Sequence, residues 1–89
     1  MKVNNIVFNK KFITQLQKLP KNIAEKTFGK LSIFEKNPFH PSLRLHKLSW
    51  KLEWMWSISI NVSVRVIFEA EEDATILLVS VGNHDMYEK

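Results

Sequence analysis

The chain has 89 residues, of which 45% are hydrophobic and 25% are charged, so it can build one hydrophobic core but not two. The absence of cysteine excludes a disulfide framework and a thiolate metal site, and it predicts a reducing, cytoplasmic setting. No apolar run is long enough to span a bilayer, and residues 1–9 are too short and too polar for a secretion signal. We therefore expect a single domain, residues 1–89, that is neither exported nor anchored to a membrane.

Charge is divided unevenly along the chain. Residues 1–51 contain 11 Lys or Arg and 2 Asp or Glu, a balance of +9, whereas residues 52–89 contain 2 and 7, a balance of −5. A basic surface attracts polyanions such as nucleic acid. Lysine-rich helices also arise because exposed helix faces must stay hydrated, and the charge count alone does not separate the two explanations.

The N-terminal part predicts a strand followed by two helices. Val3–Phe8 is short, apolar and partly β-branched, and Asn9 is a good helix N-cap. A helix over about Lys10–Leu19 would bury one apolar stripe, and Pro20 ends it. A second helix follows, because apolar and small side chains continue to recur at helical spacing at Ile23, Thr27, Leu31 and Phe34.

The C-terminal half predicts strands. Asn37-Pro38 and His40-Pro41 break the second helix, because proline pushes the preceding residue into an extended conformation. Four strand-like runs follow, with a polar hairpin loop at residues 70–74; they are Leu43–Ser49, Trp54–Asn61, Val64–Glu69 and Thr75–Val81. In Trp54–Asn61 the strict alternation predicts one buried face. The predicted fold is α+β, in the order β-α-α-β-β-β-β, with two N-terminal helices packed on an antiparallel sheet.

Several classes of site are excluded by missing motifs. There is no HExxH or Cys/His pattern, and His40 and His46 stand alone six residues apart, so we predict no metal site. There is no GxxxxGK loop either, which argues against a nucleotide-dependent enzyme. We expect no cofactor.

Six residues in or beside the predicted sheet carry groups that suit metal-free RNA cleavage: His40, His46, Lys47, Arg65, His84 and Tyr87. In that reaction a base removes the proton of the ribose 2′-hydroxyl, a cation stabilises the charged phosphorus centre, and an acid protonates the leaving 5′-oxygen. Histidine exchanges protons near neutral pH, and the donor fork of arginine matches paired phosphate oxygens.

Each of these residues also has a purely structural explanation. His40 lies between two prolines in an exposed loop, and His46 and Lys47 suit a charged edge strand that discourages aggregation. The C-terminal pair has structural roles as well, since His84 suits the end of a strand and Tyr87 can cover the edge of the core. Arg65 is harder to explain in this way, because it is a lone cation inside the apolar run of residues 62–68.

As a set, the motifs resemble the RelE/ParE toxin superfamily over essentially the whole chain. They are the Leu-Pro-Lys between the helices, Asn37-Pro38 with His40-Pro41, and the segments 45–48, 56–61, 65–68 and 82–87. The resemblance is greatest to the YafQ-like and RelE-like mRNA interferases of bacterial type II toxin–antitoxin modules. It implies a compact sheet with helices on one face, a concave side that cuts mRNA on the ribosome, and a cognate antitoxin that wraps the toxin.

The resemblance also implies roles for residues. His84 would be the acid, His40 or His46 the base, and Arg65 the group that stabilises the phosphorane. Tyr87 sits where an aromatic residue often follows. Nearby cations would bind the RNA, namely Arg44, Lys47 and Lys51.

Three positions depart from the family pattern. Related chains carry small residues near Trp50 and Trp54 and an aromatic residue at Val64. The departures favour a second hypothesis, a catalytically weak or engineered module on the same scaffold, which would bind a second copy or another protein through Trp50, Trp54, Met55 and Trp56. A third interpretation is a gyrase-directed toxin of the ParE branch, which the histidines mildly disfavour.

Overall fold

A computed structural model describes residues 1–48 and 54–83. Strands and helices follow the predicted order, which confirms the α+β class. They are β1 (Asn5–Phe8), α1 (Lys10–Gln17), α2 (Lys21–Lys36), the 3₁₀ turn η1 (Pro41–Leu43), β2 (His46–Lys47), β3 (Met55–Ser59), β4 (Val64–Ala70), the 3₁₀ turn η3 (Glu72–Ala74) and β5 (Thr75–Asn83).

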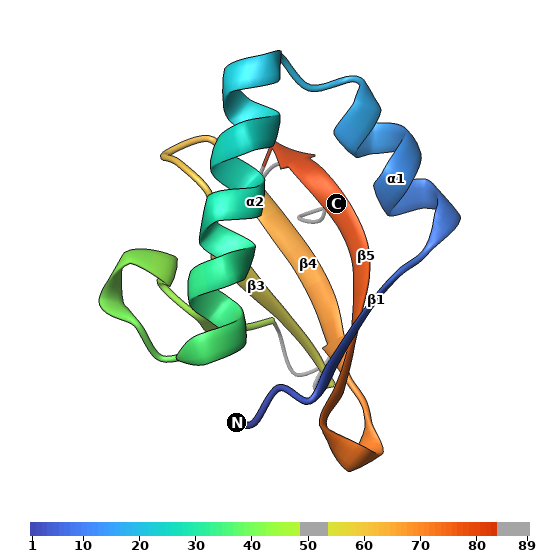
Figure 1. Ribbon diagram of the computed structural model, residues 1–89, viewed down its shortest axis with the longest axis vertical. Coiled ribbons are helices and arrows are strands. Elements are labelled where there is room, and N and C mark those ends of the chain that lie inside the picture. Colours follow the sequence, from blue (N-terminus) through green and yellow to red (C-terminus); the bar gives the residue numbers. More distant parts are fainter. Residues whose placement is uncertain (49–53, 84–89) are drawn as a thin grey trace.

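The strands form one five-stranded sheet in the order β1-β5-β4-β3-β2 (Figure 1). Strands β2 to β5 form the predicted antiparallel meander. Strand β1 lies parallel to β5, with Ile6 opposite Ile76, so the sheet is mixed. The sequence did not predict this parallel pairing, because the paired residues are about seventy positions apart. The local pattern of a strand also does not indicate whether its neighbour runs parallel or antiparallel.

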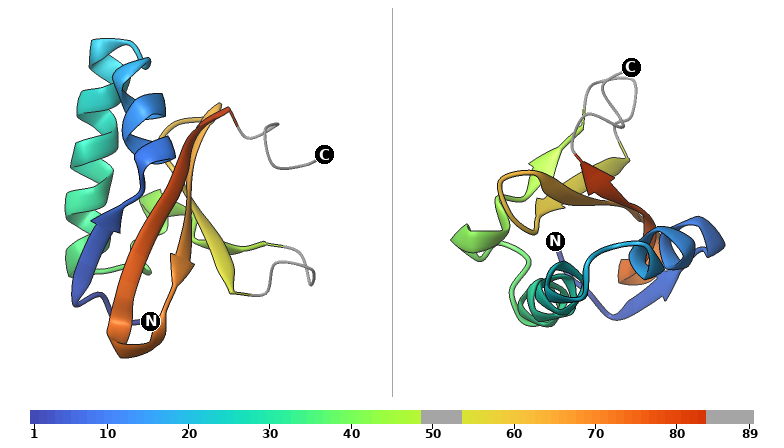
Figure 2. Two further views of the ribbon diagram at one scale, coloured as in Figure 1. Left: turned by 90° about the vertical axis from the view of Figure 1, so that its right-hand side faces the viewer. Right: turned by 90° about the horizontal axis from the view of Figure 1, so that it is seen from above.

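Helix α1 begins after Asn9, as predicted, and ends at Gln17, two residues before the predicted Leu19. The side chain of Asn9 accepts a hydrogen bond of 2.7 Å from the N–H of Phe12 and so caps α1. Pro20 is the N-cap residue of α2, which continues without a break to Lys36. Both helices lie on one side of the sheet, and they leave its opposite face without a helix (Figure 2).

The core fills the space between these helices and the sheet. Phe34 of α2 packs on Phe68 of β4 with ring centroids 5.0 Å apart, and both side chains are fully buried. Phe12 of α1 is also fully buried, and burial of one such side chain contributes about 1.5–3 kcal/mol to folding. The central strands supply the rest of the core, including Ile58, Val66, Ile76, Leu78 and Val81.

The predicted strand Leu43–Ser49 is wrong in its first part. Leu43 belongs to the 3₁₀ turn η1, and Arg44 has a left-handed backbone with φ of 47°. Pro41 starts this turn, because its fixed φ suits a helical first position. Extended pairing begins only at His46 and extends over two residues, while Ser49 lies outside the described residues.

The single buried face predicted for residues 54–61 is also wrong. Ser57 is fully buried and Ser59 is 8% exposed, whereas Trp54 is 52% exposed. Strand β3 lies inside the sheet between β2 and β4, so larger neighbours shield its small serine side chains. Polarity alone predicted solvent exposure, but in a sheet interior side-chain size matters as well.

Candidate functional site

The strand register defines a surface on the side of the sheet away from α1 and α2. Residues that face each other across antiparallel strands point to the same side of the sheet and form a row across it. We call the surface formed by two of these rows the far face. The first row is His46, Ser57, Ile67 and Ser80, and the second is Ser59, Arg65 and Gly82. The far face therefore brings together one histidine and one arginine among the residues predicted to carry the chemistry.

A β-bulge in β5 is needed to complete these rows. Phe68 faces Leu78 and Ile67 faces Ser80, so Val79 is an extra residue without a partner. Without it, the alternation that begins at the buried Leu78 would turn Ser80 toward the helices. The bulge thus turns Ser80 and Gly82 to the same side as Arg65.

Arg65 has small, uncharged neighbours. Its cross-strand partners are Ser59 in β3 and Gly82 in β5, and neither can neutralise the guanidinium group. The arginine itself is half-buried. The planar fork of donors of an arginine with uncharged cross-strand neighbours suits phosphate.

His46 lies on the same face of the sheet as Arg65. It is two strands away from Arg65 across the sheet and one row along it, which corresponds to a Cα separation of roughly 12 Å at normal strand spacings. Both residues have long side chains, and the register puts both on the far face. One phosphodiester group is therefore a candidate ligand for the pair.

His40 occupies a different environment. It lies before η1, outside the sheet, and its Nδ1 atom accepts a hydrogen bond of 3.1 Å from the N–H of Ser42. This bond caps the short turn and gives the histidine a structural function. The structure thus places His46, and not His40, on the same face as Arg65.

The predicted RNA-binding cations are distributed over several surfaces. Lys47 faces Trp56 across the strands and so points to the opposite side of the sheet from His46. Arg44 is exposed in its left-handed conformation beyond η1. Lys51, like the predicted site residues His84 and Tyr87, lies outside the described residues.

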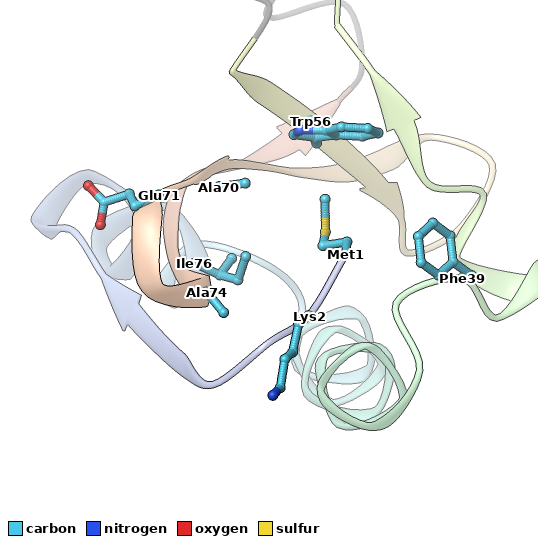
Figure 3. A pocket seen from close by; sticks show the side chains of 8 residues that line it. All are labelled: Met1, Lys2, Phe39, Trp56, Ala70, Glu71, Ala74 and Ile76. Atoms are coloured by element: carbon cyan, nitrogen blue, oxygen red, sulfur yellow. The ribbon is translucent and has the colours of Figure 1, made fainter.

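Three of the four residues of the predicted protein interface lie within the described ranges. Trp54 is 52% exposed, Met55 and Trp56 are half-buried, and Trp50 lies outside the described residues. Trp56 is one wall of a pocket of about 460 Å³ between the sheet and the N-terminus (Figure 3). The pocket is lined by Met1, Lys2, Phe39, Trp56, Ala70, Glu71, Ala74 and Ile76.

The sequence did not predict this pocket, because its lining comes from segments that are far apart in the chain. Phe39 is 61% exposed. Its position between two prolines is the one local signal for an exposed apolar side chain in this lining. Within residues 1–48 and 54–83, no three His, Asp or Glu side chains gather closely enough to hold a metal ion. The helices in these ranges are too short or too polar to cross a membrane.

Comparisons with known proteins give a family and a set of structures with the same fold. The family model described as the ParE toxin of the type II toxin–antitoxin system parDE matches residues 6–87. A search of curated proteins gives no significant match. Among solved structures, a YoeB/ParE toxin from Agrobacterium tumefaciens has a TM-score of 0.77 at 14% identity, and the alignment covers 91% of this chain and 99% of that one.

Two further structures show the same fold. YafQ from Escherichia coli has a TM-score of 0.76 at 13% identity, with 92% of this chain and 94% of that chain covered. An archaeal RelE–RelB complex from Pyrococcus horikoshii has a TM-score of 0.74 at 19% identity, with coverage of 97% and 99%. At these identities the structural likeness establishes the fold, and the family model establishes the membership.

Proposed function

This chain belongs to the RelE/ParE superfamily, the toxins of type II toxin–antitoxin systems, and we propose that it is a ribosome-dependent mRNA endoribonuclease that works without a metal. The observation that carries the proposal is the placement of His46 and Arg65 on the far face, in neighbouring rows of the register. A base and a phosphate-binding cation on one surface are the minimum that the reaction needs. Ribosomes are the proposed site of action, so the cytoplasm is the proposed location.

In the proposed reaction His46 acts as the base. It takes the proton of a ribose 2′-hydroxyl, whose oxygen then attacks the adjacent phosphorus. A bond forms between the 2′-oxygen and phosphorus, and the bond from phosphorus to the 5′-oxygen breaks. The products are a 2′,3′-cyclic phosphate and a 5′-hydroxyl, which receives its proton from an acid.

Arg65 supplies the positive charge in this scheme. Its guanidinium group would donate two hydrogen bonds to the non-bridging phosphate oxygens, where negative charge increases in the transition state. Since Ser59 and Gly82 carry no charge, this positive charge is not offset by its cross-strand neighbours. A cation with such neighbours interacts strongly with an anion brought onto the sheet.

His84 remains the proposed acid, and Tyr87 remains a proposed site residue. Both lie outside the described residues, so the support comes from the chain that leads to them. Gly82, two positions before His84, is the register partner of Arg65. The described chain thus ends at Asn83, one residue beyond the partner of Arg65, and this short separation in the sequence supports the proposal.

The test is cleavage of ribosome-bound mRNA by the purified protein and three variants. We expect Arg65→Ala and His84→Ala to lose cleavage by at least about 100-fold, in line with the usual contribution of such groups. The control is Lys11→Ala, on the helical side of the molecule, which should cleave normally. Equal cleavage by all four proteins would exclude the assignment.

A cognate antitoxin is the proposed protein partner. Several similar solved structures are toxin–antitoxin complexes, including the archaeal RelE–RelB complex. The exposed Trp54 and the apolar pocket beside Trp56 are a suitable anchor, because aromatic side chains next to a pocket dominate many interfaces. The same surface would serve self-association or another protein in the alternative of a binding module with little catalysis.

Gyrase inhibition is a second candidate activity. The observation that favours it is the family model, which is that of ParE toxins. A supercoiling assay with purified gyrase, run beside the mRNA assay, separates the two activities. Loss of supercoiling with intact mRNA would favour the gyrase-directed toxin.

A further inference from the structure

Ser57 places an unpaired hydroxyl group in the middle of the far face. The residue is 0% exposed, and its Oγ atom has no hydrogen-bond partner in the described part of the chain. Burying a hydroxyl without a partner is unfavourable, because the group loses its bonds to water and gains none. Alanine would fit the same space without that cost, so folding alone does not explain a serine here.

The neighbouring serine shows the contrast. Ser59 is on the same strand and the same face, and its Oγ atom donates a hydrogen bond of 2.9 Å to the main-chain oxygen of Asn61. That bond belongs to the turn between β3 and β4 and accounts for Ser59 structurally. Within residues 1–48 and 54–83, the hydroxyl of Ser57 makes no comparable bond.

The register identifies the group that can use this hydroxyl. Ser57 lies between His46 on β2 and Ile67 on β4. Ile67 cannot form a hydrogen bond, whereas the imidazole of His46 can. Directly opposed residues have Cβ atoms roughly 4.5–5.5 Å apart, and the contact needs the serine to adopt the staggered conformer that points its Oγ atom to the ring.

We propose that Ser57 is a positioning residue for His46. Its Oγ atom accepts a hydrogen bond from the N–H of one imidazole nitrogen, which leaves the other nitrogen unprotonated and available as the base. When that second nitrogen takes the 2′-hydroxyl proton, Ser57 still accepts from the first and exchanges no proton itself. This role rests on the proposed function, because it assigns the base of that reaction.

The first test is kinetic and uses the full chain with ribosome-bound mRNA. We expect Ser57→Ala to lower kcat about 10- to 100-fold with KM unchanged, because a misoriented base acts less often. Ser57→Thr keeps the hydroxyl and should recover most of the rate. The control is Ser80→Ala, since Ser80 is 4% exposed on the same face and Ile67 separates it from Ser57.

The second test does not need activity. The ¹⁵N chemical shifts of the His46 ring report which nitrogen carries the proton, and we expect Ser57→Ala to change that balance while Ser80→Ala leaves it as in the wild type. Unchanged ring shifts together with unchanged kcat in Ser57→Ala would overturn the role of Ser57, although wild-type cleavage would still support the nuclease. If the wild type cleaves no mRNA, the nuclease proposal fails, and the ring shifts alone decide the contact between Ser57 and His46.

Discussion

The side chain of Gln15 accepts a hydrogen bond from the main-chain N–H of Val81, with 2.9 Å between the Oε1 and nitrogen atoms. Strand β1 pairs with β5 only as far as Leu78. Beyond that point, the Gln15 side chain of helix α1 bonds to the main chain at this edge of β5. Val81 directly precedes Gly82, the partner of Arg65. Helix α1 therefore holds in place the part of β5 that pairs with Arg65.

Removal of this side chain should destabilise the protein. Gln15→Ala leaves the N–H of Val81 without its partner, and we expect a loss of about 1–3 kcal/mol in the free energy of unfolding. Urea denaturation measures the change. Gln17→Ala on the exposed side of the same helix is the matched control, and equal stabilities of the two variants would count against the bond.

The aromatic contact between α2 and the sheet should be the more costly one to remove. Phe34→Ala deletes a fully buried ring that packs on Phe68, and such changes cost about 3–5 kcal/mol. Phe28→Ala removes a ring of the same helix that is 53% exposed and should cost less than about 1 kcal/mol. Thermal unfolding of both variants distinguishes them, and a similar drop in Tm would contradict the assigned core.

A tyrosine at position 64 would be much larger than the buried valine that it replaces. Val64 is 8% exposed and packs with the core cluster, on the side of the sheet opposite Arg65. We expect Val64→Tyr to destabilise the protein by about 1–3 kcal/mol through overpacking, without raising cleavage. Val62→Tyr is the control, because Val62 is 90% exposed; a more active, equally stable Val64→Tyr variant would be the contrary result.

Arg44 allows RNA binding to be separated from folding. Glycine adopts its left-handed backbone, with φ of 47°, without steric cost, and this gain roughly offsets the added flexibility of the unfolded chain. We expect Arg44→Gly to change the free energy of unfolding by less than about 0.5 kcal/mol. The slope of log RNA affinity against log salt concentration should become shallower by the amount that corresponds to about one phosphate contact. An unchanged salt slope would remove Arg44 from the RNA-binding surface.

Local sequence signals predicted most of the elements but not how they pair. Asn9 and Pro20 mark the helix starts because capping and proline chemistry act within a few residues. The turn after β3 is also local, since the Asn61 side chain accepts hydrogen bonds from the N–H groups of Ser63 and Val64. In contrast, the parallel pairing of β1 with β5 depends on contacts between distant residues, which no local pattern encodes.

The candidate site shows the same division. Residue type singled out His46 and Arg65 as candidates, but only the register shows that they share a face while Lys47 points away. The bulge at Val79 sets the face of Ser80 and Gly82, and its position depends on how two strands fit together. The unpaired hydroxyl of Ser57 was missed because a serine among alternating residues looks like an exposed one.

The central claim is that His46 and Arg65 act together on one phosphodiester group. The most direct measurement is kcat for cleavage of ribosome-bound mRNA by the wild type, His46→Ala, Arg65→Ala and the double variant. We expect each single change to lower kcat by about 100-fold or more, and the double change to cost much less than the product of the two, because groups that act as a unit are not additive. Wild-type cleavage by His46→Ala would contradict the account.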